Sequence, residues 1–272
     1  MHRDVAAVER RNLAEIERLN QRGGRTLSIV DLIEDGTITP RMAAFCWLAV
    51  GQGASVLTGA LPGGVGKTTL MATLLSFLPP GERIVTVEDG GVLARVFSGD
   101  VPAPVTLMAH EIGSGRWFGY IWGRQAAQFF GTWQRGIRRV SCLHADDPEQ
   151  TCAALLPLGV AEEDLGRIGL QLYMCARRGP GGVLRRVGAL HCVLAGRLRR
   201  LWQWLPAEDR FEQLVECDEL CKLAAAEHGV SAGDVQEAWE AREACLEELR
   251  SAGVRRFEAV RAGVVEFGRA RG

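Results

Sequence analysis

The sequence predicts an α/β fold followed by a C-terminal α-helical tail. A glycine-rich loop, Gly63 to Thr69, stands between an apolar run typical of a buried strand and a segment with helical spacing. Two further apolar runs, 83–89 and 140–143, have the length of strands and are separated by helical segments. From Pro206 onward the chain is predicted to be helical, with a stretch rich in Glu, Ala and Arg. These patterns predict an α/β body and a helical tail.

The composition is that of a globular protein without an excess of either charge. The chain has 272 residues, 47% of them apolar, which suffices for one large or two modest domains. Its net charge of −1 gives no general basic surface, so no nucleic-acid partner is expected. Paired arginines crowd one region, which favours a solvated face or a subunit contact: Arg177-Arg178, Arg185-Arg186 and Arg199-Arg200.

The sequence also indicates the compartment. Residues 1–24 lack the apolar core of a signal peptide, and no run of 18 apolar residues occurs. The eight cysteines contain no Cys-x-x-Cys pair, which is typical of reduced thiols in the cytosol. Cys217 and Cys221 are one helical turn apart, with His228 nearby, and offer a metal site, but a structural role is favoured. We therefore expect a cytoplasmic protein.

The elements before the second strand are predicted from local signals. A charged helix is expected over residues 4–20, ended by glycines. Thr39 followed by Pro40 is a favourable helix start, an N-cap with proline in the first turn. The strand, glycine loop and helix come next, and the Pro-Pro-Gly sequence at 79–81 predicts a turn.

Two predicted strands end in polar residues. The strand 83–89 ends in Glu88 and Asp89, and the strand 140–143 leads into His144-Ala145-Asp146. In open α/β sheets, chemistry is placed at the carboxyl edge of the strands. We therefore expect these side chains at one edge of the sheet.

The remaining segments complete the predicted organisation. A stretch rich in Gly and Pro, to about residue 116, carries no predicted element, and a helix is expected over 123–134. A hairpin is expected from strands 172–176 and 187–193 around a turn at 179–182, and Ser231 with Asp234 resembles a capping box. The predicted divisions are an N-terminal helix and linker, 1–24, an α/β domain, 25–205, and a helical subdomain, 206–272.

The glycine-rich loop has the residues of a nucleotide phosphate site. Lys67 is one of only two lysines in the chain, and an ammonium on a flexible stem reaches between β- and γ-phosphates as a point charge. Glycines let backbone N–H groups converge on an anion, and the following helix offers its positive end. Thr68 is expected to hold Mg²⁺. The predicted nucleotide ligands are Gly63, Gly64, Val65, Gly66, Lys67, Thr68 and Thr69.

One position departs from the usual loop pattern. Leu61 stands where the pattern has its first glycine, and Pro62 pushes Leu61 toward an extended backbone. The entry to the loop must therefore differ, with Gly59 or Gly63 taking the turn.

In order and spacing these motifs resemble the ATPases of type II and type IV secretion systems, above all the archaeal ones that drive type IV pili and the archaellum. Residues 31–45 are similar to the family's approach to its nucleotide site, and 75–89 to the stretch ending in its acidic "Asp box". Residues 141–146 are similar to its "His box", and 241–254 to the C-terminal helices of the archaeal branch. The resemblance covers nearly the whole chain and implies a RecA-like P-loop NTPase core that uses ATP and Mg²⁺.

The resemblance also implies roles for three further residues. Glu88 would position or activate water, His144 would sense the γ-phosphate, and Arg124 would stabilise charge in the transition state. Each also has a structural interpretation: Glu88 as part of a strand-to-loop turn, His144 as a core histidine, and Arg124 as a surface ion pair.

Two positions depart from the family. Tyr120 falls where the family has its Walker B glutamate, and Gln125 replaces a second acid. A phenol is neutral at pH 7 and is a poor metal ligand. The region between Asp89 and Tyr120 is shorter than usual, and the separate N-terminal domain is expected to be missing. These departures predict slow or conditional hydrolysis.

The expected function is an ATP-binding, ATP-hydrolysing subunit of a secretion, pilus or archaellum-like machine. The resemblance implies a homo- or hetero-hexamer with secretion ATPase subunits, held at the membrane by an inner-membrane platform protein. The alternative is a non-catalytic pseudo-ATPase partner of a full-length secretion ATPase. Partition and septum-site ATPases rank lower, because Pro62 occupies the place of their signature lysine. The tryptophans Trp117, Trp122, Trp202 and Trp204 are expected in the core or at an interface.

Overall fold

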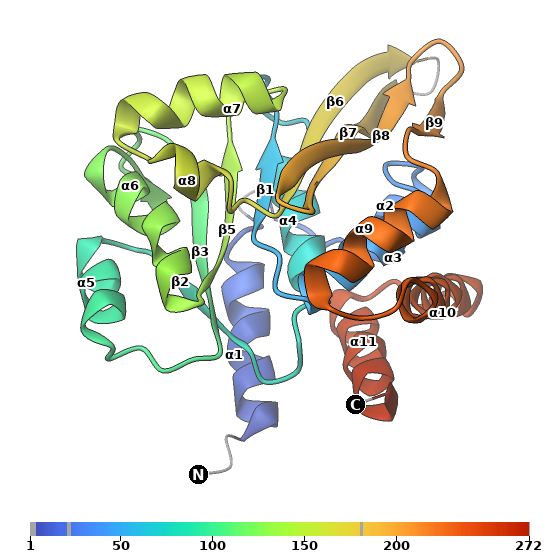
Figure 1. Ribbon diagram of the computed structural model, residues 1–272, viewed down its shortest axis with the longest axis horizontal. Coiled ribbons are helices and arrows are strands. Elements are labelled where there is room, and N and C mark those ends of the chain that lie inside the picture. The colour runs from blue at the N-terminus through green and yellow to red at the C-terminus, as the bar shows by residue number, and fades with distance from the viewer. Residues whose placement is uncertain (1–3, 21–22, 180–181, 272) are drawn as a thin grey trace.

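The computed structural model describes residues 4–20, 23–179 and 182–271. Its strands form one nine-stranded sheet in the order β2-β3-β5-β1-β6-β7-β8-β9, with β4 paired to β3 (Figure 1). The strands are β1 Val56–Gly59, β2 Arg83–Thr86, β3 Val105–Ile112, β4 Tyr120–Ile121, β5 Arg138–Leu143, β6 Leu170–Gly179, β7 Gly182–Leu194, β8 Arg197–Leu205 and β9 Arg210–Gln213.

The sheet has a parallel half and an antiparallel half. Strands β2, β3, β5, β1 and β6 run parallel, whereas β7, β8 and β9 continue from β6 as antiparallel neighbours. Strand β1, which precedes the glycine-rich loop, lies between β5 and β6. Its last residue, Gly59, is in register with Leu143 and Tyr173. After β1 the chain crosses to the edge strand β2 and then forms β3 and β5, which fill the positions between β2 and β1. Strand β1 is therefore the point at which the strand order reverses. Open α/β sheets bind ligands at this position.

Helices cover both faces of the sheet. Val56 belongs to one buried cluster and Leu57 to another, as expected from the alternation of side chains along a strand. The first cluster includes residues of α2, α3, α4, α9, α10 and α11, and the second includes residues of α5, α6 and α7 (Figure 1). The helices are α1 Val5–Glu17, α2 Ile29–Glu34, α3 Pro40–Gly51, α4 Lys67–Leu75, α5 Gly90–Ser98, α6 Arg124–Gly131, α7 Pro148–Leu155, α8 Glu162–Leu165, α9 Cys217–His228, α10 Ala232–Ser251 and α11 Phe257–Arg271, with 3₁₀ turns at Thr132–Arg135 and Leu156–Leu158.

The structure confirms the predicted α/β class with C-terminal helices, and it confirms several local signals. Thr39 caps α3 by accepting a hydrogen bond from the Met42 N–H at 3.1 Å. Ser231 and Asp234 form the expected capping box at the start of α10. The expected hairpin is longer than predicted, because β6 and β7 pair from Leu170 to Gly179, while the turn residues 180–181 lie outside the described residues.

Several elements were not expected from the sequence. The predicted strand 83–89 ends at Thr86, and helix α5 follows it. Strand β3 occupies part of the stretch predicted to carry no element. The region from Pro206, predicted to be helical, first forms β9, which pairs with the equally unexpected β8.

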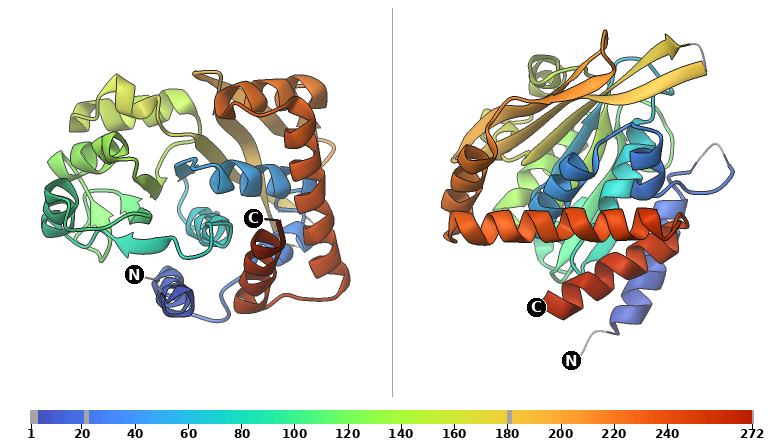
Figure 2. Two further views of the ribbon diagram at one scale, coloured as in Figure 1. Left: turned by 60° about the horizontal axis from the view of Figure 1, so that its bottom comes forward. Right: turned by 90° about the vertical axis from the view of Figure 1, so that its right-hand side faces the viewer.

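The C-terminal helices pack into the same core as the sheet. The Trp239 indole N–H donates to the Arg41 carbonyl at 2.9 Å, and the Trp239 ring contacts Phe45 and Trp202. Helix α11 lies beside α1 (Figure 2), where Arg261 pairs with Glu9. Trp202 and Trp204 are buried as predicted, but Trp117 and Trp122 are 70% and 46% exposed. Within the described residues, no helix combines the length and apolarity needed to cross a membrane.

Candidate functional site

The glycine-rich loop connects β1 to α4 at the carboxyl edge of the sheet. Gly64 and Gly66 adopt φ angles of +82° and +109°, a region that favours glycine. Gly66 immediately precedes α4 and makes no side-chain cap, so the free N–H groups of the first helical turn are left for another acceptor. Val65 is buried and anchors the loop. Strand, loop and helix thus form the geometry of a phosphate-binding cradle.

Lys67 faces the interior of this loop. Its side chain is buried, and the residue is only 6% exposed. Nζ donates to the Ala60 carbonyl at 3.1 Å and lies 3.3 and 3.4 Å from the two ring nitrogens of His144. The Thr58 hydroxyl donates to the Lys67 carbonyl at 3.2 Å, which ties the start of α4 to β1. The predicted lysine and histidine therefore meet at one point.

The segment after β5 holds the entry of the loop. The Leu61 N–H donates to Asp146 Oδ1 at 2.7 Å, and His144 Nδ1 lies 2.8 Å from the Leu61 carbonyl. A Cβ on Gly59 would stand 2.5 Å from the Ala145 carbonyl oxygen, so only glycine lets this segment pass so close to the end of β1. Leu61, which departs from the usual loop pattern, is thus anchored through its backbone.

A carboxylate that the sequence interpretation missed completes the cluster. Glu111 lies near the end of β3, its side chain is only 13% exposed, and Oε1 lies 2.8 Å from His144 Nε2. The Tyr120 hydroxyl donates to Glu111 Oε2 at 3.5 Å, because β4 pairs with β3 and sets Tyr120 opposite Glu111. Tyr120 therefore replaces the expected glutamate in the motif, while Glu111 supplies a carboxylate beside it.

Two predicted catalytic residues make no recorded contact with this cluster. Glu88 is exposed and makes no hydrogen bond or ion pair to any residue that the structure describes. It follows β2, three strands from β1, which places the two strands about 14 Å apart at the usual strand spacing. Its neighbour Asp89 caps α5, accepting from the Gly91 N–H at 2.8 Å. Arg124 is exposed at the start of α6 and is likewise without a recorded partner among the described residues.

The buried groups beneath the loop are neutral. The Cys142 thiol lies 3.2 Å from the Thr58 hydroxyl and 4.0 Å from the Thr68 hydroxyl, and burial raises the pKa of Cys142 to about 11. Burial and the nearby Glu111 raise the pKa of Tyr120, so its hydroxyl remains a hydrogen-bond donor at neutral pH. The basic Lys67 and the acidic Glu111 therefore lie on either side of the His144 ring.

The oxygen donors fit a magnesium ion bound together with a nucleotide. Within the described residues, no group of three or more metal-ligating side chains is preassembled. Mg²⁺ usually takes only one or two protein ligands and fills its remaining positions with water and phosphate oxygens. The Thr68 hydroxyl and the Glu111 carboxylate are hard oxygen donors of the kind this ion prefers.

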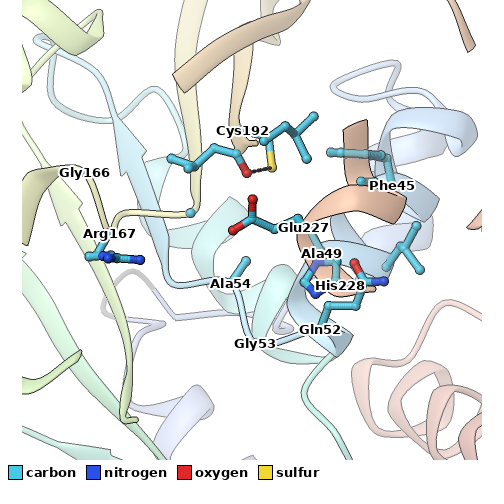
Figure 3. A pocket seen from close by; sticks show the side chains of 15 residues that line it. Phe45, Ala49, Gln52, Gly53, Ala54, Gly166, Arg167, Cys192, Glu227 and His228 are labelled. Atoms are coloured by element: carbon cyan, nitrogen blue, oxygen red, sulfur yellow. Dashed lines mark hydrogen bonds between the residues drawn. The ribbon is translucent and has the colours of Figure 1, made fainter. Parts of the chain in front are cut away.

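A separate cavity of about 190 Å³ lies at the opposite edge of the sheet (Figure 3). It is lined by Ala54, which precedes β1, by Cys192 of β7, and by Glu227 and His228 at the end of α9. Neither Cys217 nor Cys221 lines it, and Cys217 accepts a hydrogen bond from Arg41 Nη2 at 3.0 Å. All eight cysteines fall within the described residues as free thiols.

Comparison with known proteins finds distant relatives. No family model matches the sequence. An uncharacterized protein of Methanocaldococcus jannaschii is 26% identical over 212 residues, which cover 67% of this chain and 77% of that protein. A second is 43% identical over 67 residues, covering 23% of this chain and 9% of the relative, and a third is 26% identical over 209 residues, covering 68% and 38%. The chain thus matches well under half the length of the second and third relatives.

Among solved structures, the X-ray structure of the Yersinia pseudotuberculosis ATPase DotB aligns with 86% of this chain and 62% of its own. The TM-score is 0.38 and the sequence identity is 11%. A likeness this weak adds nothing to the fold and the site described above.

Proposed function

We propose that this protein binds ATP with Mg²⁺ at the loop between β1 and α4 and hydrolyses it. The observation that carries this proposal is the cluster of Lys67, His144 and Glu111 at the mouth of a phosphate cradle, with His144 Nε2 2.8 Å from the Glu111 carboxylate. Phosphoryl transfer to water requires a cation at the phosphates, a metal that neutralises developing charge, and a group that orients the water. The cluster supplies the first and the last of these.

Each residue has a defined role in the proposed reaction. Lys67 and the N–H groups of the loop bind the β- and γ-phosphates, and Thr68 with Glu111 would hold Mg²⁺ and its bound waters. Mg²⁺, when bound, neutralises charge on the transferred phosphoryl group. Glu111 accepts a hydrogen bond from the attacking water and so orients it toward the γ-phosphate. An intact carboxylate at this position would permit hydrolysis despite Tyr120.

His144 is suited to report the presence of the γ-phosphate. Its ring contacts Lys67 on one side and Glu111 on the other. A phosphate that binds the Lys67 ammonium would crowd the His144 ring, whose nitrogens lie 3.3 and 3.4 Å from Nζ. The displaced imidazole would then change its contact with Glu111, which couples phosphate binding to the carboxylate that orients water.

The finer proposal is that the chain serves a type II or type IV secretion, pilus or archaellum-like machine. It is supported by the likeness of residues 75–89 and 141–146 to the Asp and His boxes of those ATPases. Glu88 and Arg124 are exposed, which leaves both available to a neighbouring subunit of the proposed hexamer. Contact with an inner-membrane platform protein, and a cytoplasmic position at the membrane through it, belong to the same proposal.

The test is phosphate release from ATP by the purified chain with Mg²⁺, run beside Lys67→Ala, with nucleotide binding measured separately. We expect binding and turnover in the wild type, and loss of both in the variant, because Lys67 is the cation inside the cradle. Binding without turnover would favour the pseudo-ATPase partner. Equal, negligible binding by the wild type and Lys67→Ala would overturn the proposed function.

A further inference from the structure

The hairpin of β6 and β7 extends beyond the end of the loop strand. Tyr173 of β6 is in register with Gly59, the last residue of β1, yet β6 continues to Gly179. Strand β7 runs antiparallel to it from Gly182 (Figure 1). The outer part of this hairpin therefore projects past the carboxyl edge of the sheet, on the side where the phosphate cradle opens.

One face of the hairpin contacts the last glycine of the loop. A Cβ placed on Gly66 would lie 3.4 Å from Met174 Cε and 3.7 Å from Arg185 Cδ. Arg185 is in register with Ala176, two residues along β6 from Met174, so Arg185 and Met174 belong to the same face of the hairpin. The aliphatic part of Arg185 thus lies over the residue that immediately precedes α4 and Lys67.

Arg185 differs from its neighbours in how its charge is used. The Arg186 guanidinium is buried and pairs with both carboxylate oxygens of Asp209 at 2.8 Å. Arg177 donates to the Pro206 carbonyl and lies over the Trp204 ring. Arg185 is exposed, and among the described residues its guanidinium has no recorded hydrogen bond, ion pair or ring contact. Its charge is free to bind an anion, although its stem is held against the loop.

We propose that Arg185 is a second cationic ligand for the polyphosphate chain of the nucleotide, supplied by the hairpin across the loop from Lys67. This inference rests on the proposed nucleotide site and adds a residue that the loop motif does not contain. The Lys67 ammonium lies inside the loop and bonds to the Ala60 carbonyl, so it meets the phosphates from within. Arg185 meets them from outside, above Gly66.

The chemistry of an arginine suits this outer position. A guanidinium offers a planar fork of N–H donors that binds two phosphate oxygens at once, whereas the compact ammonium of lysine fits the narrow interior of the loop. The negative charge of a polyphosphate is larger than the charge that one lysine and the loop N–H groups can neutralise. A second cation therefore lowers the electrostatic cost of holding the polyphosphate in the site. The exposed guanidinium of Arg185 becomes ordered when the anion binds.

The experiment compares the affinity for ATP with Mg²⁺ and the affinity for tripolyphosphate, measured by displacement of a fluorescent ATP analogue. The variants are Arg185→Ala, Arg185→Lys and Lys67→Ala. Arg197→Ala serves as the matched control, because Arg197 is an exposed arginine of the same sheet that pairs with Leu194, at the opposite end of β7. Thermal unfolding of each variant verifies that the fold is retained.

We expect Arg185→Ala to weaken ATP and tripolyphosphate alike by about tenfold, the loss of one charged hydrogen-bonded contact. Arg185→Lys should recover part of the affinity, since it keeps the charge but not the fork, and Arg197→Ala should bind as the wild type does. Wild-type affinity in Arg185→Ala, with binding lost in Lys67→Ala, would overturn this inference and leave the proposed function standing. A loss for ATP but none for tripolyphosphate would also overturn it, because Arg185 would then contact the nucleoside. Absence of nucleotide binding in the wild type would overturn both.

Discussion

Glu111 Oε1 and His144 Nε2 lie 2.8 Å apart, although the two residues are 33 positions apart in the sequence. Glu111 lies near the end of β3, and His144 follows β5, which pairs in parallel with β3. The same imidazole reaches the Lys67 ammonium and the Leu61 carbonyl. One histidine therefore connects the lysine of the glycine-rich loop with the carboxylate that we propose orients water.

The first prediction concerns which carboxylate supports turnover. Glu111→Gln should lower the rate of ATP hydrolysis by about a hundredfold or more while ATP affinity stays within a few-fold of wild type, since the amide cannot orient water as a carboxylate does. Glu88→Gln is the matched control, because Glu88 is exposed and lies at the edge strand. The measurement is steady-state phosphate release together with the dissociation constant for ATP. A larger loss in Glu88→Gln than in Glu111→Gln would contradict the role given to Glu111.

The second prediction distinguishes the contribution of the Tyr120 hydroxyl from that of the neighbouring Glu111 carboxylate. The Tyr120 hydroxyl donates a long hydrogen bond, 3.5 Å, to Glu111 Oε2. Tyr120→Phe removes only this donor, so turnover should fall by less than about tenfold, the range of one weak neutral-to-charged hydrogen bond. Phosphate release by Tyr120→Phe beside Glu111→Gln measures the difference. If both variants lose activity equally, the phenol is itself required, and Glu111 does not stand in for the glutamate missing from the motif.

The sequence predicted the strand, glycine-rich loop and helix because the residues that form them are local. The strand, the glycines, Lys67 and the helix all lie between Val56 and Leu75, and each has a strong signal of its own. Glu111 had a weaker signal, an acid near the end of the apolar run 105–112. Its place beside Tyr120 depends on the pairing of β3 with β4 and on the irregular register between Ala109 and Ile112. Such bulges re-aim side chains, and no local pattern reveals them.

The missed elements have similar causes. Helix α5 begins with Gly90 and Gly91, which predict a loop when the Asp89 cap is not recognised. Strand β8 contains three arginines and two tryptophans among its nine residues, and its alternation is visible only once Leu201 is known to be buried. Glu88 and Arg124 are both exposed, Glu88 after the edge strand β2 and Arg124 at the start of α6, and the similarity of motifs carries no information about exposure.

The third prediction concerns the close approach at Gly59. A methyl group there would stand 2.5 Å from the Ala145 carbonyl oxygen and 2.6 Å from Tyr173 Cδ1. Gly59→Ala should therefore cost about 1 to 3 kcal/mol of unfolding free energy, as overpacking of a tight site does. It should also reduce hydrolysis, because the displaced segment carries His144. Gly63→Ala is the control for stability, since a Cβ on Gly63 would meet nothing within 4 Å. Urea unfolding of the two variants tests the difference, and equal stability would contradict the reported contact.

The fourth prediction concerns acid stability. Burial lowers the pKa of His110 to about 4 and that of His191 to about 4, and Arg200 adds to the effect at His191. Both ring nitrogens of His110 are without a partner in the described structure, and His191 Nε2 accepts from Arg200 Nε at 3.2 Å. An unfolded histidine has a pKa of about 6.5, so between pH 6.5 and 4 the unfolded chain binds protons that the native protein does not. Stability from these groups is full above pH 6.5 and is lost as pH falls toward 4.

The magnitude is about 1 to 3 kcal/mol for each histidine over this range. Urea unfolding at several values from pH 7.5 to pH 4.5 measures it. His110→Gln and His191→Gln should each flatten the dependence, while the exposed His228→Gln should leave it unchanged. An identical slope in all three variants would show that other groups cause the acid sensitivity.

The last prediction concerns a clamp formed by Arg261, which joins the C-terminal helix α11 to the end of α4, the helix that follows the glycine-rich loop. Arg261 is buried and donates to the carbonyls of Ser76 and Leu78, just after α4, at 2.8 and 2.5 Å. It also pairs with both carboxylate oxygens of Glu9 in α1. Arg261→Ala leaves a partly buried carboxylate and two carbonyls without their donor, so it should cost about 3 to 5 kcal/mol of unfolding free energy.

Arg256→Ala is the matched control for this clamp. The Arg256 side chain is 81% exposed, and its nearest carboxylate contact, to Glu258, is 3.7 Å. Such a surface pair is worth less than about 1 kcal/mol, so Arg256→Ala should unfold nearly as the wild type does. Urea unfolding compares the two variants directly. A loss in Arg261→Ala no larger than in Arg256→Ala would mean that the C-terminal helix does not support the loop helix. A large loss confined to Arg261→Ala would mean that the stability of the phosphate cradle depends on the helical tail.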